Sequence, residues 1–230
     1  MMKRVGVVLL LAAAVFGGDF SRTNLQYLSG SGFKEIAGGY VVDDTMKTLT
    51  LEHYSTWGYG DNFFFVDNQS GDFDHFGTKL EYVTYMEWAP RLSLSKLSGT
   101  QLQIGIVKDF YLSGQINQGE GYHATLLGAG VDLDIPFFAV FGVNVYQKED
   151  NFDNTLTQTT INWLMPVGFV VFEGFVDVTE DETLAQPQLL IDLAAAGLDR
   201  DRLLAGVELY YYRTDAVDIS VPQVMLKWVW

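Results

Sequence analysis

Residues 79–92 read Lys-Leu-Glu-Tyr-Val-Thr-Tyr-Met-Glu-Trp-Ala-Pro-Arg-Leu, and side chains of two chemical kinds alternate along this stretch. The first set holds the charges: Lys79, Glu81, Val83, Tyr85, Glu87, Ala89 and Arg91. The second set is mainly apolar or aromatic: Leu80, Tyr82, Thr84, Met86, Trp88, Pro90 and Leu92. Successive side chains of a β-strand point to opposite faces, so the stretch predicts a strand with one charged face and one oily face.

The same alternation recurs along the chain to its end. Between residues 223 and 230, the set Val224, Leu226, Trp228 and Trp230 alternates with Gln223, Met225 and Lys227. No comparable helical pattern is found beyond residue 20, and only residues 189–197 are ambiguous. Runs bounded by turn residues predict about twelve strands, near residues 20–29, 47–57, 60–68, 79–92, 100–112, 123–135, 137–148, 155–165, 169–179, 185–195, 203–214 and 219–230.

Composition excludes several classes of protein. The 230 residues include no cysteine, which removes thiol nucleophiles, disulfides and thiolate metal sites, and the three histidines are His53, His75 and His123. We therefore expect no metal site and no cofactor. The formal net charge of -15 also argues against binding nucleic acid, because phosphate recognition needs clustered lysine and arginine.

The N-terminal segment has the layout of a secretory signal. Lys3 and Arg4 precede an apolar run over residues 5–16, and the small residues Gly17 and Gly18 follow it. A run of about 12 apolar residues is shorter than the roughly 20 that a membrane-spanning helix needs. We predict a signal peptide over residues 1–17 and a single exported domain over residues 18–230.

The choice between a soluble and a membrane protein depends on which face of each strand meets water. A soluble sandwich or barrel would bury the apolar set, whereas a membrane barrel turns it toward lipid and points the charged set into a wet interior. The signal, the strand lengths near the roughly 9–11 residues that cross a bilayer, and a C-terminal strand ending on Trp230 favour the membrane barrel. The predicted fold is all-β, a closed antiparallel transmembrane barrel in the bacterial outer membrane.

The expected connections fit such a barrel, because an even strand number leaves both chain ends on the periplasmic side. Tight turns are expected at residues 58–60, at Pro136 and at residues 166–168, and longer polar loops over residues 29–46, 68–78, 113–122 and 179–184. The links over residues 93–99 and 196–202 fall on the short side but are not tight. The expected partners are outer-membrane lipid and, since residues 221–230 resemble a C-terminal assembly signal, the barrel assembly machinery.

One segment resembles a known family. Residues 49–53, Leu-Thr-Leu-Glu-His, and residues 57–67, Trp-Gly-Tyr-Gly-Asp-Asn-Phe-Phe-Phe-Val-Asp, are similar to the early hairpin of nucleoside-specific channel-forming (Tsx-like) outer-membrane proteins. The resemblance implies a narrow pore in a monomer, through which nucleosides or similar small neutral solutes diffuse. It implies no catalytic residues, and weak binding sites made of aromatic and ionisable side chains in the lumen.

Taking the polar set of each strand as inward gives the candidate lumen residues. Aromatic rings could stack on a nucleobase, and carboxylates could accept hydrogen bonds from ribose hydroxyls. The candidates are Glu52, Tyr54, Asp61, Phe63, Phe65, Asp67, Glu81, Tyr85, Glu87, Arg91, Asp109, Glu173, Glu208, Tyr210 and Lys227.

Two alternative functions stay open at this stage. His53 and Ser55 lie two apart on one strand face, the spacing by which an outer-membrane phospholipase presents a His–Ser pair, and Asn62 on the next strand could orient the imidazole. A barrel with a plugged lumen could instead serve a structural or receptor role. The sequence after Ser55 departs from the Asn-Gly-rich motif of the phospholipase, so we favour the channel over an enzyme.

Overall fold

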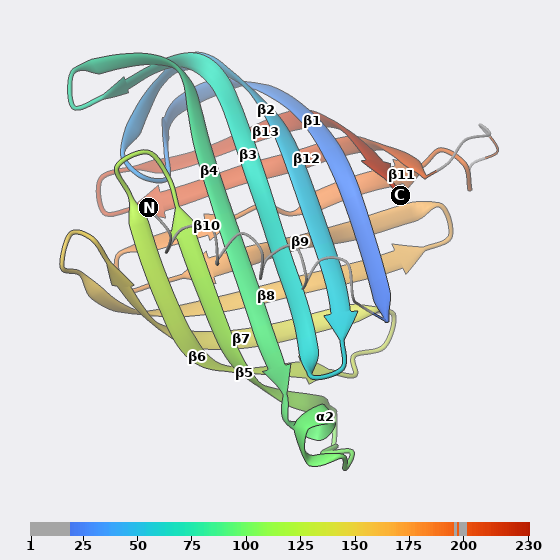
Figure 1. Ribbon diagram of the computed structural model, residues 1–230. Coiled ribbons are helices and arrows are strands. Elements are labelled where there is room, and N and C mark those ends of the chain that lie inside the picture. Colours follow the sequence, from blue (N-terminus) through green and yellow to red (C-terminus); the bar gives the residue numbers. More distant parts are fainter. Residues whose placement is uncertain (1–18, 196, 198–201) are drawn as a thin grey trace, which may run out of the picture.

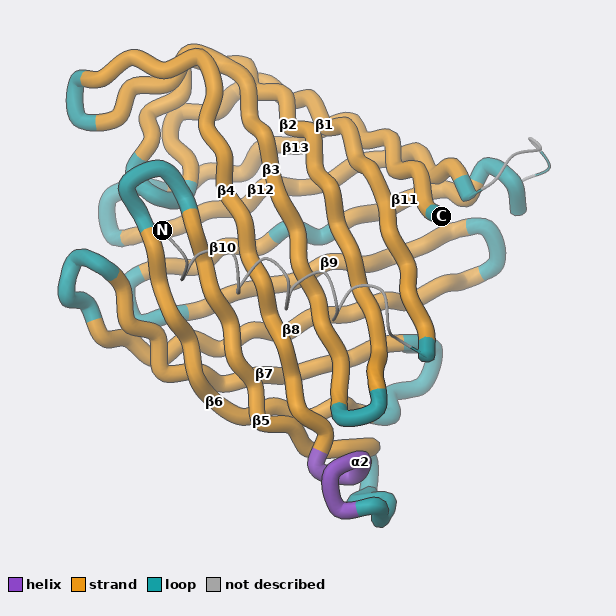
Figure 2. Tube along the Cα trace, viewed as in Figure 1, coloured by secondary structure: helices purple, strands orange, loops and turns teal. Residues whose placement is uncertain are grey.

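The computed structural model describes residues 19–195, 197 and 202–230. The predicted signal peptide, residues 1–17, lies outside these residues. Nearly all of the described chain is strand (Figure 2). The elements are β1 (Phe20–Ile36), β2 (Tyr40–Trp57), β3 (Gly60–His75), β4 (Thr78–Ser93), α2 (Leu94–Ser98), β5 (Val107–Gln118), β6 (His123–Leu133), β7 (Val140–Asp150), β8 (Thr155–Val167), β9 (Val170–Val178), β10 (Glu182–Ala185), β11 (Gln188–Asp192), β12 (Leu203–Thr214) and β13 (Asp218–Val229).

The strands form one antiparallel sheet that closes on itself. Each strand from β1 to β9 pairs with the next in sequence, and β1 closes the ring by pairing with β13, from Asn24 opposite Val229 to Gly30 opposite Gln223. The tilted strands of the two walls cross in the view of Figure 1. Since β10 and β11 are two parts of one interrupted strand, the barrel has twelve strands, and the predicted fold is confirmed.

The interruption between β10 and β11 has a local cause. Pro187 has no backbone N–H to donate, and residues 186 and 187 separate the two short strands. On the neighbouring strand β9, Gly174 has a φ of 147°, and a Cβ atom there would lie 2.5 Å from the carbonyl oxygen of Gln186. The two backbones approach closely here, and the site requires glycine.

The burial pattern confirms the predicted alternation on the last strand. Gln223, Met225 and Lys227 are buried, whereas Val224, Leu226, Trp228 and Trp230 are 63%, 49%, 50% and 52% exposed. The chain therefore turns its oily row outward and its polar row inward. That is the reverse of a soluble fold and the arrangement of a barrel that lipid surrounds.

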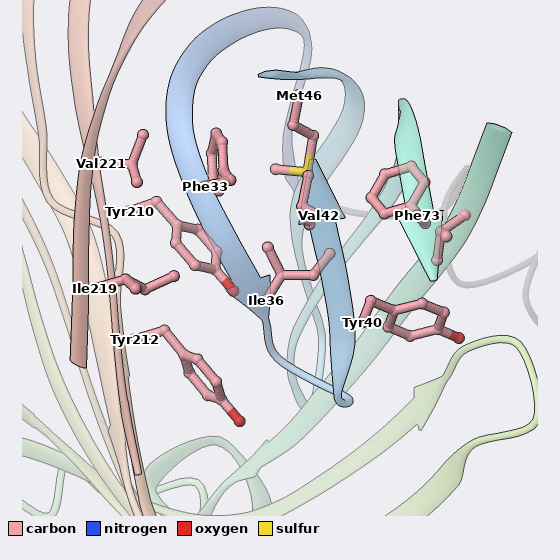
Figure 3. Close-up of a cluster of buried hydrophobic side chains, with 11 residues drawn as sticks. Phe33, Ile36, Tyr40, Val42, Met46, Phe73, Tyr210, Tyr212, Ile219 and Val221 are labelled. Carbon is pink, nitrogen blue, oxygen red and sulfur yellow. The ribbon is translucent and has the colours of Figure 1, made fainter. Parts of the chain in front are cut away.

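The interior is less polar than the alternation predicted. At the end of the barrel opposite the chain termini, inward side chains of β1, β2, β3, β12 and β13 form an apolar cluster (Figure 3). Phe33 and Tyr210 pack with ring centroids 5.6 Å apart, and the Ala37 backbone N–H donates to the Tyr210 hydroxyl at 2.9 Å. The β1–β2 hairpin thus bends inward and packs on β12, two strands away in the ring. We call this end of the barrel the hairpin end, and the other the terminal end.

The loops at the hairpin end are shorter than predicted, and the expectation of long loops over residues 29–46, 68–78 and 113–122 is wrong. The strands continue through most of these stretches, and the turns lie at residues 37–39, 76–77 and 119–122. Gly32 and Gly71, which suggest loops in the sequence, lie within strands close to shifts in pairing register. Glycine is typical of such bulges as well as of turns.

The longest connection instead lies at the terminal end, where α2 and the segment after it project from the barrel (Figure 1). The strand predicted over residues 100–112 begins only at Val107, and the helix was not predicted at all. Ser93 caps α2 by accepting from the Lys96 backbone N–H, and Gly99 ends it with a φ of 67°. Within the described residues, no helix has the length and apolar character needed to cross a membrane.

We predict that Gly174→Ala destabilises the barrel by about 1–3 kcal/mol, because alanine would have to adopt an unfavourable φ and meet the Gln186 carbonyl. Gly58→Ala is the matched control, since a Cβ atom at Gly58 meets no atom within 4 Å. Urea unfolding in detergent micelles measures both. Equal midpoints for the two variants would show that the backbone at Gly174 is not constrained.

Candidate functional site in the barrel interior

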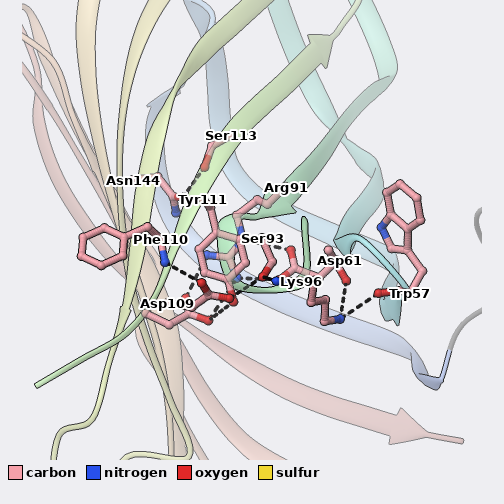
Figure 4. Close-up of polar contacts among 12 residues, drawn as sticks. Trp57, Asp61, Arg91, Ser93, Lys96, Asp109, Phe110, Tyr111, Ser113 and Asn144 are labelled. Atoms are coloured by element: carbon pink, nitrogen blue, oxygen red, sulfur yellow. Dashed lines mark hydrogen bonds and ion pairs between the residues drawn. The ribbon is translucent and has the colours of Figure 1, made fainter. Parts of the chain in front are cut away.

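An arginine clamp occupies the terminal end of the interior (Figure 4). Arg91 on β4 donates to both carboxylate oxygens of Asp61 on β3, at 2.9 and 2.8 Å, and to Oδ1 of Asp132 on β6 at 2.9 Å. Its guanidinium lies 4.0 Å from the ring centroid of Tyr111, whose hydroxyl donates to Asp132 at 2.9 Å. Bidentate pairing and stacking hold the guanidinium rigidly, so this group serves as a fixed part of the wall.

Beside the clamp, Asp109 holds the projecting segment rather than lining an open interior. Its carboxylate accepts hydrogen bonds from the Ser93 hydroxyl and from the backbone N–H groups of Ser95 and Phe110. Lys96 on α2 donates from Nζ to the carbonyl oxygens of Trp57 and Gly60 at 2.7 and 3.1 Å. These contacts tie α2 to the β2–β3 turn.

A lysine on the last strand links distant parts of the wall. Lys227 on β13 is buried, and its Nζ lies 2.8 Å from Oε1 of Glu173 on β9 and 3.5 Å from Oε1 of Glu52 on β2. Asn24 and Gln26 on β1 donate to the two oxygens of Glu52 at 2.7 and 3.2 Å. Because β13 and β9 are not neighbours in the ring, this bridge spans part of the interior and narrows it.

Four further carboxylates are hydrogen-bonded only to neutral groups. Asp67 accepts from Thr50, and Asp177 from Thr160. Glu87 accepts from the Tyr85 hydroxyl at 2.7 Å and from Gln115 at 2.9 Å, and Glu208 accepts from Gln188 at 2.7 Å and from Gln223 at 3.0 Å. We call Asp67, Glu87, Asp177 and Glu208 the acidic belt.

An aromatic run lies on β3 and β4. The ring centroids of Phe63 and Phe65 are 6.2 Å apart, and those of Phe65 and Tyr85 are 6.0 Å apart. These side chains share strand parity with the inward-facing Asp61, Asp67 and Glu87. In the closed strand order β9, which carries Glu173 and Asp177, stands across the barrel from β3. The aromatic run on β3 and β4, which also carry ionisable side chains, thus faces the carboxylates of β9.

The structure brings most of the predicted lumen residues into these interior groups. They are Glu52, Asp61, Phe63, Phe65, Asp67, Tyr85, Glu87, Arg91, Glu173, Glu208 and Lys227. Tyr54, also inward by parity, pairs with Phe20 at 6.2 Å between ring centroids.

Three predicted residues lie elsewhere. Glu81 is exposed, close to the register shift at the hairpin end of the β3–β4 pair, so simple alternation does not carry its carboxylate into the interior. Tyr210 belongs to the apolar cluster at the hairpin end, and Asp109 binds the segment around α2.

The sequence prediction missed the neutral polar side chains that hold the carboxylates. They are Asn24, Gln26, Thr50, Gln115, Gln188 and Gln223. Each lies inward by strand parity, so the signal was present. These amide and hydroxyl side chains were missed because only aromatic and ionisable residues were predicted to line the lumen.

The residues of the phospholipase alternative lie on the other face. His53, Ser55 and Asn62 share strand parity with the exposed Leu49 and Leu51, and so face outward. The His53 Nδ1 atom lies 2.8 Å from the Thr23 hydroxyl, and the His53 ring stacks on Phe64. Within the described residues, the Ser55 hydroxyl has no hydrogen-bond partner, so the nucleophile–base contact of a serine hydrolase is not formed.

A closed antiparallel barrel with an apolar outer face and an interior rich in charged and amide side chains is a transmembrane β-barrel of the outer-membrane type. The model of the family described as "Nucleoside-specific channel-forming protein, Tsx" matches residues 41–181, and the chain belongs to this family. The match includes the segment over residues 49–67 that resembles the early hairpin of these proteins.

Curated relatives agree with this assignment. The outer membrane protein OmpK of Vibrio parahaemolyticus is 25% identical over 183 residues, which cover 73% of this chain and 69% of the relative. The OmpK of V. parahaemolyticus serotype O3:K6 is 24% identical over 188 residues, with the same shares of both chains. The protein is therefore a channel for small solutes in the bacterial outer membrane.

Solved porins were also compared. A mutant of the Rh. blastica porin aligns over 92% of this chain and 100% of its own, with a TM-score of 0.37 and 10% identity. Pseudomonas putida OprB aligns over 100% and 98%, with a TM-score of 0.39 and 8% identity.

We predict that Lys227→Gln destabilises the barrel by about 3–5 kcal/mol, because it leaves Glu173 and Glu52 close together in the interior without their cation. Lys79→Gln is the matched control, since Lys79 pairs with Asp74 at the surface and its side chain is 81% exposed. That variant should change stability by less than about 1 kcal/mol. Urea unfolding in micelles measures both, and equal effects would contradict a structural role for the Lys227 bridge.

Proposed function

We propose that the solutes of this channel are nucleosides and chemically similar neutral molecules, and that the protein is not an enzyme. The observation that carries the proposal is the pairing of an aromatic run on β3 and β4 with an ionisable wall on β9. The family to which the chain belongs, that of nucleoside-specific channel-forming proteins, supports the proposal.

A nucleoside has a partner for each of its halves in this interior. The π-face of the base can stack on Phe63, Phe65 or Tyr85, a contact worth about 1–3 kcal/mol in nucleic-acid binders. The ribose hydroxyls can donate to the carboxylates across the barrel. Both contacts are weak, as a pore requires, because a solute that binds must also leave.

The partners of the barrel follow from the same account. The exposed apolar row of β13 is suited to contact outer-membrane lipid, and the chain ends in the aromatic pair Trp228 and Trp230, with ring centroids 5.0 Å apart. We propose that the barrel assembly machinery recognises this terminal strand. The closed ring leaves no unpaired strand edge, which supports a monomeric channel.

Single-channel recording tests the proposal. In planar bilayers, adenosine or thymidine should block the current in a saturable manner, whereas sugars and amino acids of similar size should block poorly. Equal block by all solutes would reduce the protein to a general pore. A complete lack of conductance would favour the plugged receptor.

Substitutions on β3 test the aromatic contact. We predict that Phe65→Ala raises the half-blocking nucleoside concentration roughly five- to 150-fold, the equivalent of about 1–3 kcal/mol of lost stacking. Phe64→Ala is the control on the same strand, since this ring faces outward and stacks on His53. If nucleosides block the current through both variants at the same concentration as in the unmodified protein, Phe65 packs in the barrel wall and contacts no solute.

A further inference from the structure

The acidic belt lacks cationic partners. Within the described residues, none of Asp67, Glu87, Asp177 and Glu208 takes part in an ion pair, and their hydrogen bonds come from hydroxyl and amide groups. Neutral donors orient a carboxylate but leave its charge uncompensated. The belt therefore places four carboxylates in the interior that no described cation contacts directly.

Three cations of the interior are engaged by other carboxylates. Arg91 binds Asp61 and Asp132, and Lys227 binds Glu173 and Glu52. Lys148 lies 3.4 Å from Oε1 of Glu182. The charged group of each of these three side chains therefore lies next to a carboxylate outside the belt.

The belt residues lie close enough for their fields to add. Asp67 and Glu87 lie on the inner face of the paired strands β3 and β4, where Asp67 is opposite Tyr85 and Glu87 is opposite Phe65, a diagonal separation of about 7–8 Å. Among the described residues, however, no group of three carboxylates or imidazoles converges closely enough to hold a metal ion. The geometry suits a distributed potential acting on a passing ion rather than a chelation site.

A second observation adds acceptors beside the belt. Gln188 and Gln223 are both more than nine-tenths buried, and each donates its amide N–H to Glu208. Their Oε1 atoms have no hydrogen-bond partner within the described part of the chain. These unpaired amide oxygens lie beside the Glu208 carboxylate and add hydrogen-bond acceptors next to the belt, groups with which an ammonium donor interacts favourably.

We infer that the acidic belt makes this channel selective for cations over anions, and that it favours solutes carrying an ammonium group over anionic solutes of equal size. The inference rests on the proposed function as a channel, and extends it from neutral nucleosides to the charge of the solutes. Clefts lined by one sign of charge raise the local concentration of counter-ions by about tenfold or more.

The reversal potential in a KCl gradient across a planar bilayer tests this inference. The permeability of K⁺ should exceed that of Cl⁻ by about tenfold or more in the unmodified protein. The double variant Glu87→Gln/Glu208→Gln, which removes two belt charges and keeps the side-chain shapes, should lower the ratio at least about threefold. Both proteins are compared at the same pH and salt, because screening weakens exposed charges.

A matched double variant controls for net charge. Asp43→Asn/Glu149→Gln also removes two carboxylates, but both residues are exposed at the hairpin end, on β2 and β7. This control should keep the K⁺ preference of the unmodified protein. Circular dichroism and the heat-dependent shift in gel mobility confirm that each variant has formed its barrel.

The outcomes separate the inference from the proposed function. Absence of any conductance would overturn the channel function itself. A conducting channel that nucleosides block but that passes K⁺ and Cl⁻ equally would overturn cation selectivity and leave the nucleoside proposal intact. A K⁺ preference that survives Glu87→Gln/Glu208→Gln, or falls equally in the control, would show that the belt is not its source.

Discussion

Closure of the sheet is the constraint on which the rest of this structure depends. A strand in lipid must pair every backbone N–H and C=O, and only a ring of strands without an edge satisfies this requirement. The pairing of β1 with β13 completes that ring. Once the ring is closed, each strand presents one row of side chains to lipid and the other to the interior. The row with the charged side chains faces inward, because charges in lipid are costly.

The chemistry of the interior follows from this enforced orientation. Charges that face a narrow space must pair, be hydrogen-bonded or attract counter-ions, and the structure shows the first two solutions. Arg91 and Lys227 form ion pairs, whereas the acidic belt relies on neutral donors and stays uncompensated. Strands β3 and β4 carry both the Asp61–Arg91 ion pair and the aromatic run. Contacts that stabilise the barrel and contacts available to a solute therefore lie on the same strands.

Much of the fold was predictable because the signal was strictly local. Alternation along residues 79–92 and 223–230 predicts both the strands and their faces, and the even strand count fits a closed barrel with both chain ends on the periplasmic side. The same local reasoning failed at glycines, because glycine is typical both of turns and of irregular positions within strands. Gly32 and Gly71 suggest loops but lie in strands near register shifts, whereas Gly99 ends a helix that a short apolar stretch did not reveal.

The site was predictable in part for the same reason. Strand parity places Glu52 and Lys227 on the inner face, but only the closed ring brings β13 near β9 and joins Lys227 to Glu173. Parity could not show that the β1–β2 hairpin bends inward, because that depends on packing between strands far apart in sequence. Tyr210 accordingly packs in an apolar cluster instead of lining a polar path.

The central claim is that adjacent side chains of one strand meet lipid and water in turn. Because the chain has no cysteine, single cysteines can carry nitroxide spin labels at residues 65, 66, 86 and 87, which form two cross-strand pairs, Phe65 with Glu87 and Val66 with Met86. In lipid vesicles, a water-soluble nickel complex should raise the spin relaxation rate of labels at residues 65 and 87 the most. Dissolved oxygen, which concentrates in lipid, should raise that of labels at residues 66 and 86 the most. The reverse pattern, or no alternation, would contradict the inside-out barrel.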